Sequence, residues 1–90
     1  MKLNLYSLFD RKMNIYLAPF PSRHPVEAMR SIRDGANQPG FKDTPVGAYP
    51  ADFDLYFVAT FDDDSGKVGC PMTPELIGNI EAIITGGDIV

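Results

Sequence analysis

The sequence has few of the residue types on which most catalytic and metal sites depend. Its 90 residues include one cysteine, one histidine and no tryptophan. Cys70 alone forms no internal disulfide, and no Cys or His partners of a structural zinc site stand near it. No phosphate loop, nucleophile elbow or dinucleotide fingerprint occurs. The sequence therefore predicts a protein that is not an enzyme and that has no cofactor.

Long apolar runs are also absent, as is a leader with a charged segment followed by an apolar one. A membrane span needs roughly 18 continuous apolar residues, and no window approaches that length. We expect no membrane contact and a cytosolic location.

The length and composition suit one small globular domain. Apolar residues make up 44% of the chain and charged residues 22%, near the average for an ordered domain. Ninety residues supply one modest core, so we expect a single domain over residues 1–90. A chain this small buries more surface by associating, and an apolar stripe near the C-terminus leads us to expect a homodimer.

Charge is distributed unevenly along the chain. Residues 1–40 carry six basic and three acidic residues, a net +3, whereas residues 41–90 carry two basic and nine acidic residues, a net −7; the total is −4. An acidic total disfavours strong nonspecific DNA binding, but the basic half leaves a nucleic-acid role open.

The first half of the chain predicts a hairpin followed by a helix. In residues 2–18 apolar residues alternate, with Leu3, Leu5 and Phe9 on one side of a strand and Tyr6 and Leu8 on the other. A polar break at residues 10–12 marks the turn of the hairpin. Residues 25–36 change to helical spacing, with a proline suited to the first turn and a glycine near the end.

The second half begins with a loop over residues 38–50, which is rich in proline and glycine. A strand follows, with one wholly apolar face and one mixed face. The apolar face contains Phe53, Leu55, Phe57, Ala59 and Phe61, and the mixed face contains Asp54, Tyr56, Val58 and Thr60. A short return strand completes a second hairpin over residues 53–70.

Residues 74–85 predict a second helix. Thr73 is the expected N-cap, and two glycines follow the segment. Its apolar stripe is formed by Leu76, Ile77, Ile80, Ile83 and Ile84. The expected fold is therefore α+β: a four-stranded antiparallel sheet built from two β-hairpins, with two helices packed on it. The alternative is an OB-like, partly open barrel.

Three consecutive aspartates, Asp62 to Asp64, are the candidate ligands for a hard cation. Counted from Asp62, a twelve-residue calcium loop would need a glycine where Lys67 stands and a glutamate where Thr73 stands. We therefore interpret the tip as a hairpin turn closed at Gly66, with no metal site. A magnesium-dependent nuclease built on these aspartates is a weaker hypothesis.

Basic residues in the first half are the candidates for contacts with phosphate groups. Arg23, Arg30 and Arg33 recur at spacings of seven and three, so they share a helix flank. Arg11 and Lys12 stand in the first turn. The competing interpretation is a solvated face paired with nearby acidic residues. Exposed tyrosines would add stacking platforms for single-stranded bases; the candidates are Tyr6, Tyr16, Tyr49 and Tyr56.

These segments together resemble the small nonstructural protein of gokushovirus-type microviruses, tailless phages with circular single-stranded DNA. The resemblance covers nearly the whole chain, through LNLYSLFDRKMNIYLAPF, VEAMRSIRDGAN, YPADFDLYFVATFDDDSGKV and a closing TPE segment. Its most specific part extends from Tyr49-Pro50 to Gly66. The chain departs from the family pattern at GGDIV, where a more basic tail is expected.

The resemblance implies a protein that acts in the host cytoplasm and assists viral DNA replication or single-strand synthesis. It supplies no catalytic residues. The leading hypothesis is a non-enzymatic protein that binds single-stranded DNA or the replication complex, with phosphate contacts from the basic residues named above. The alternative is a protein-interaction module that recruits a host or viral replication factor without touching nucleic acid.

Overall fold

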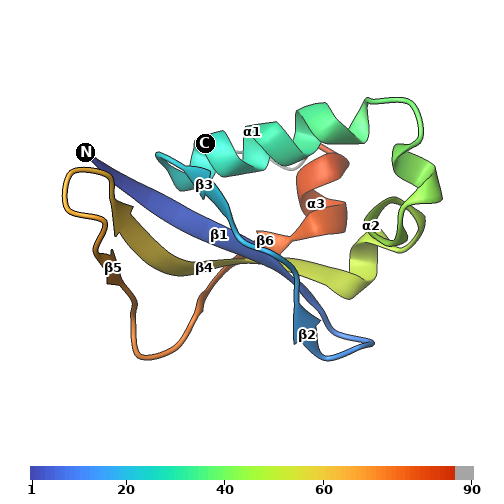
Figure 1. Cartoon of the computed structure of the whole chain (residues 1–90). Helices are drawn as coiled ribbons and strands as arrows, with labels where there is room; N and C mark the ends of the chain where they lie inside the picture. Colours follow the sequence, from blue (N-terminus) through green and yellow to red (C-terminus); the bar gives the residue numbers. More distant parts are fainter. Residues whose placement is uncertain (87–90) are drawn as a thin grey trace.

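The structure, a computed structural model, describes residues 1–86, and Figure 1 shows an antiparallel sheet with helices on one side of it. Over these residues the strands are β1 (Lys2–Asp10), β2 (Ile15–Tyr16), β3 (Phe20–Ser22), β4 (Phe53–Asp62), β5 (Val68–Gly69) and β6 (Glu75–Asn79). The helices are α1 (Pro25–Ala36), α2 (Pro45–Ala48) and α3 (Ile80–Ile84), with 3-10 turns η1 (Phe41–Asp43) and η2 (Pro50–Asp52). The predicted α+β class is confirmed.

The long strands β1 and β4 form the centre of the sheet. They pair from Lys2 opposite Asp62 to Asp10 opposite Phe53. The outer edge of β1 takes two short strands, β2 and β3, and the outer edge of β4 takes β5 and β6. The sheet in the described residues thus has six strands, where the two predicted hairpins supply four. It does not close, so the OB-like barrel is wrong.

One extra residue in β4 divides this strand into two parts of opposite phase. Leu5 pairs with Ala59 and Tyr6 with Phe57, which leaves Val58 without a partner on β1. Such a β-bulge shifts the alternation by one residue, so the side chains beyond it point to the other face. The prediction that Phe53 to Phe61 share one apolar face is therefore wrong. Phe57 lies on the helix side, and Ala59 and Phe61 lie on the opposite side.

Helix α1 begins and ends where its sequence predicts. The His24 side chain accepts a hydrogen bond from the backbone N–H of Val26 at 3.1 Å, and Pro25 occupies the first turn. This contact satisfies one of the free N–H groups at the start of the helix. His24 is thus the N-cap, and its ring is part of the helix boundary.

The segment from 74 to 85 is a strand followed by a short helix, so the predicted single helix is wrong. Residues Glu75–Asn79 pair with the part of β4 that β5 does not reach. The backbone N–H and C=O groups of β4 need hydrogen-bond partners there. Asn79 then turns the chain, because its side chain caps α3 by accepting from the N–H of Glu81 at 3.1 Å. Thr73 is not a cap. Ile80 and Ile83 of the apolar stripe are buried inside the protomer.

The predicted loop after α1 contains three short helical turns, η1, α2 and η2. Thr44 holds two of them together: its hydroxyl accepts from the N–H of Gly47 at 3.1 Å and donates to the carbonyl of Phe41 at 2.6 Å. The backbone packs so closely here that a Cβ on Gly47 would lie 1.9 Å from the Phe41 carbonyl oxygen. Proline and glycine therefore shape a tight corner here.

The core lies between the helices and one face of the sheet. Its buried members are Tyr6, Ala28, Phe53, Leu55, Ile80 and Ile83. Tyr6 is fully buried, and its hydroxyl accepts from the Asn4 side-chain amide at 3.0 Å. No helix among residues 1–86 is long and apolar enough to span a membrane. Most of GGDIV, where the chain departs from the family pattern, lies outside the described residues.

We predict opposite effects for two glycine-to-alanine substitutions. Gly47→Ala should lower the free energy of unfolding by about 1–3 kcal/mol, because its Cβ collides with the Phe41 backbone. Gly35→Ala, in α1 with nothing within 4 Å of the added Cβ, should raise it by about 0.5–1 kcal/mol. Urea denaturation monitored by circular dichroism measures both values. Equal effects of the two substitutions would contradict the described corner.

Candidate functional site

The face of the sheet opposite the helices is largely apolar, and no helix in the described residues covers it. Cross-strand partners share a face, so the register assigns its members. None of them belongs to the buried core cluster or packs against it. We call this surface the open face and define it by Leu3, Leu5, Phe9, Tyr16, Tyr56, Ala59, Phe61, Val68 and Leu76.

Three aromatic rings pack together on the open face, near the end of β1 that leads into β2. Phe9 and Tyr16 have ring centroids 4.6 Å apart, and the Tyr56 ring lies 6.0 Å from Phe9 and 5.6 Å from Tyr16 in edge-on geometry. These distances are those of stabilising aromatic pairs. Tyr16 remains 47% exposed. The rings therefore form a rigid platform that is open to solvent.

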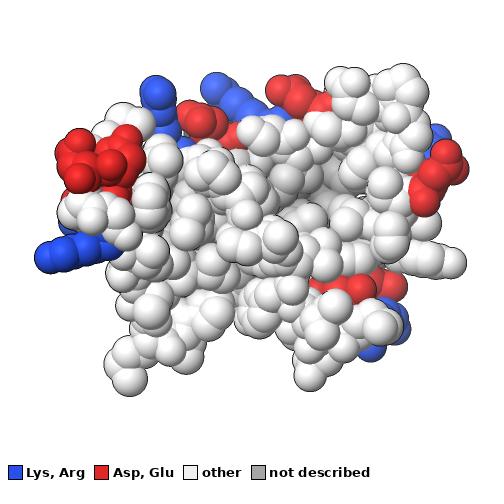
Figure 2. All heavy atoms as spheres, in the orientation of Figure 1, with Lys and Arg blue, Asp and Glu red and all other residues white. Residues whose placement is uncertain are grey.

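The open face has little charge of its own. Among the described residues that the register places on this face, Asp54 is the charged one. It lies opposite Phe9, and its carboxylate lies 3.3 Å from Arg11 Nε. Asn79 Nδ2 also donates to Asp54, at 2.9 Å. In Figure 2, which has the orientation of Figure 1, charged groups lie along the helix side and at the two ends of the molecule, and mostly uncharged residues lie between them. Charge on the open face is thus internally paired.

Two apolar arms border the open face. One is the turn and strand at residues 11–16, and the other is the segment at residues 68–76; Figure 1 shows both projecting away from the helices. Large exposed apolar side chains concentrate on them: Met13, Ile15, Tyr16, Val68, Met72 and Leu76. The arms therefore extend the apolar surface beyond the edges of the open face.

The predicted phosphate-binding residues are divided between two parts of the fold. Arg30 and Arg33 belong to α1, on the helix side, and Arg23 stands two residues before α1 begins. Arg33 Nε donates to the Ile83 carbonyl at 3.2 Å and thereby ties α1 to α3. Arg11 and Lys12 belong to the β1–β2 turn, where Arg11 also donates to the Ala51 carbonyl. The five residues do not form one basic surface.

The three aspartates at the β4–β5 turn surround an ammonium group. Their carboxylates have oxygens within 4.8 Å of one another, and the Met1 amino nitrogen lies 2.6 Å from Asp63 and 3.0 Å from Asp64. These hydrogen bonds raise the pKa of the Met1 amino group above its ordinary 8.0. The backbone N–H of Asp64 bonds to the Asp62 carboxylate at 3.0 Å and, with the Ser65 hydroxyl, lowers the pKa of Asp62. The predicted turn is confirmed, with Gly66 at φ 74°.

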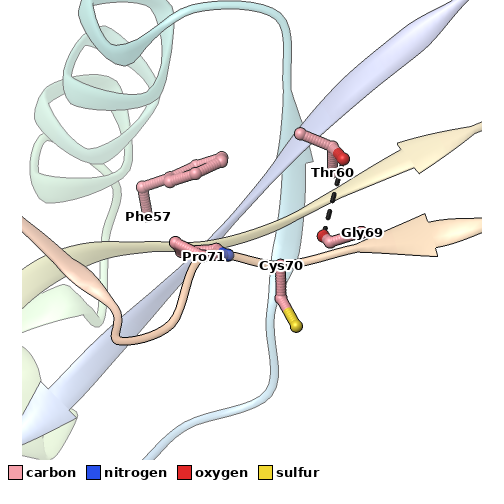
Figure 3. Close-up of a pocket in the computed structure, with 5 residues that line it drawn as sticks. All are labelled: Phe57, Thr60, Gly69, Cys70 and Pro71. Carbon is pink, nitrogen blue, oxygen red and sulfur yellow. Dashed lines mark hydrogen bonds between the residues drawn. The ribbon is translucent and has the colours of Figure 1, made fainter.

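An open hollow of about 250 Å³ lies beside β5, and Figure 3 shows the residues around it. Phe57, Thr60, Gly69, Cys70 and Pro71 line it. The Thr60 hydroxyl lies 3.5 Å from the Gly69 carbonyl oxygen, and the Cys70 thiol points away from the Phe57 ring. A small-molecule site needs several converging polar groups. This hollow offers a bonded hydroxyl and a lone thiol, which make no such set.

Sequence patterns revealed part of the open face in advance. Two of the tyrosines expected as stacking platforms, Tyr16 and Tyr56, lie on it, whereas Tyr6 is buried and Tyr49 lies between α2 and η2. Phe9 was not singled out. The pattern that indicates the open face lies in the first strand, where both faces are largely apolar although helices cover only one of them.

The comparisons with known proteins connect this chain to phage proteins. The family model described as Phage ORF5 protein matches residues 3–83, which extend from β1 into α3. Protein ORF5 of Chlamydia phage 1 is 36% identical over 69 residues, covering 74% of this chain and 71% of that relative. No solved structure matches the chain.

We predict a low pKa for Asp62 in a carboxyl-carbon NMR titration. Its value should lie below 3.8, because backbone and side-chain donors stabilise the charged form. A folded pKa below the unfolded one means that the stabilisation is complete above the unfolded pKa and is lost as the pH falls through the folded pKa. Ser65→Ala should move the Asp62 pKa upward, towards 3.8. A wild-type value at or above 3.8 would rule out the described turn.

Proposed function

Because the chain belongs to the Phage ORF5 protein family, we propose that this small phage protein assists viral DNA replication or single-strand synthesis without catalysing a reaction. It acts in the host cytoplasm as a nonstructural protein. Its mode of action is contact with other protein molecules of the replication machinery. The observation that carries this proposal is the open face.

The composition of the open face supports a protein partner. A large contiguous apolar patch on a small protein marks an interaction surface. The centres of protein interfaces are depleted in charged residues and enriched in aromatic residues and methionine. The open face and its arms have this composition, with three aromatic rings at one end of the face and Met13 and Met72 on the arms.

Single-stranded DNA is the second candidate, and the aromatic platform favours it. Exposed rings on a sheet stack bases in several families of nucleic-acid-binding proteins. Such surfaces also need cations that follow the phosphate backbone. Here Arg11 is paired with Asp54, and three of the candidate arginines are on the helix side of the sheet. The protein partner is therefore the stronger of the two.

Phage replication in infected cells tests the proposed function. In a phage genome that carries Tyr16→Ala, the yield of viral DNA should fall severalfold, because the substitution removes an exposed ring of the open face. Tyr49→Ala is the matched control, since Tyr49 is 66% exposed and lies off the strands. Quantitative measurement of double-stranded and single-stranded viral DNA gives the result. Wild-type yields from Tyr16→Ala would contradict a role for the open face.

Fluorescence anisotropy with a labelled single-stranded oligonucleotide separates the two candidates. A protein-binding role predicts no salt-sensitive binding by the purified chain at low ionic strength. Binding that weakens steeply with salt, and that Tyr16→Ala and Tyr56→Ala reduce more than Tyr49→Ala, would establish DNA as the ligand instead.

A further inference from the structure

We propose that the open face is the interface of a symmetric homodimer, in which two copies of this chain pack their sheets against each other. The inference rests on the proposed function, since it names the first protein partner of the same surface. Of the C-terminal stripe, this interface includes Leu76, because Ile80 and Ile83 are buried in the core and Ile77 and Ile84 pack against it.

The first argument is the amount of apolar surface that one copy leaves exposed. The buried hydrophobic residues of the described chain number seven, and two of these are alanines. Eight large hydrophobic residues are exposed, and six of those are on the open face and its arms. Single exposed apolar residues are normal, but a group on one side of a small protein indicates a partner. Met72 is fully exposed, at 103%, so its side chain is not packed within one chain.

The second argument is size. From Leu3 to Phe9, β1 extends over about 20 Å, and four strands side by side span roughly 15–20 Å. The flat area is roughly 300–400 Å², before the relief of the side chains and the two arms are added. A stable protein interface buries about 800 Å² on each partner. The flat face supplies about half of that area, so a stable dimer must bury the two arms together with the open face.

The third argument is charge. In a two-fold contact the same surface meets itself, so an unpaired charge near the axis would face an identical charge. The charged pair on the open face, Asp54 with Arg11, is neutral as a unit and lies towards one end of β1. Single-stranded DNA would instead bring a row of phosphates onto a surface that offers it no excess of cations. The open face is therefore compatible with its own copy and poorly matched to a polyanion.

Sedimentation equilibrium of the full chain tests the dimer. At micromolar concentrations the wild-type mass should be twice the 9.9 kDa of one chain. Leu76→Asp and Tyr16→Asp should each raise the dimer dissociation constant at least tenfold, roughly 1.4 kcal/mol or more, because each buries a carboxylate against the partner. Tyr49→Asp, at a position more exposed than either of these but off the open face, should leave the dimer intact. Circular dichroism and cooperative urea unfolding establish that each variant is folded.

A second measurement does not depend on substitutions. In a mixed sample of isotope-labelled and unlabelled chains, filtered NMR should detect contacts between protomers at Phe61 and Leu5, both on the open face. A wild-type monomer, or a dimer whose contacts map to α1, would overturn the inference. A monomer in which Tyr16→Ala still impairs phage replication would overturn the dimer alone and leave the proposed function in place. A monomer that binds single-stranded DNA through Tyr16 would overturn both.

Discussion

The pairing of β1 with β4, interrupted by one unpaired residue, is the constraint on which the rest of the structure depends. Before the bulge at Val58, Phe53 and Phe57 of β4 face the helices and help to form the core. After it, the alternation of the strand changes phase, and Phe61 faces the other way. One strand thus supplies apolar side chains to both faces of the sheet. The fold therefore has a core on one side and an exposed apolar surface on the other.

Local patterns were sufficient for the elements whose stability is local. The bounds of α1 follow from its cap, its first-turn proline and its spacing, all of which lie within its own sequence. The two central strands follow from alternation. The bulge does not, because it arises from the register between two distant segments, and the sequence of β4 alternates without a break. Strand β6 was missed for the same reason: Leu76, Ile77 and Ile80 fit a helical period, but the free edge of β4 gives Glu75–Asn79 a partner.

The candidate site was only partly visible in the sequence. Spacing placed Arg23, Arg30 and Arg33 on one helix, which is confirmed for the two that lie within α1. It could not show that Arg33 bonds to α3 or that Arg11 pairs with Asp54, since both contacts join segments far apart in the chain. The resemblance to a gokushovirus protein is confirmed by the family match and by the relative from Chlamydia phage 1. The family was thus easier to recognise from the sequence than the open face, on which the proposed function rests.

The outer edge of β4 is shared by two short strands that do not meet. β5 pairs with Thr60 and Phe61, and β6 pairs with residues 54–57, so the chain between them arches past the bulge without a ladder of its own. Because no register fixes the length of that arch, an insertion there costs mainly loop-closure entropy, about 0.6 kcal/mol for each doubling of the loop. An insertion in residues 70–74 would therefore lengthen one arm beside the open face at little cost in stability, while the core stays the same.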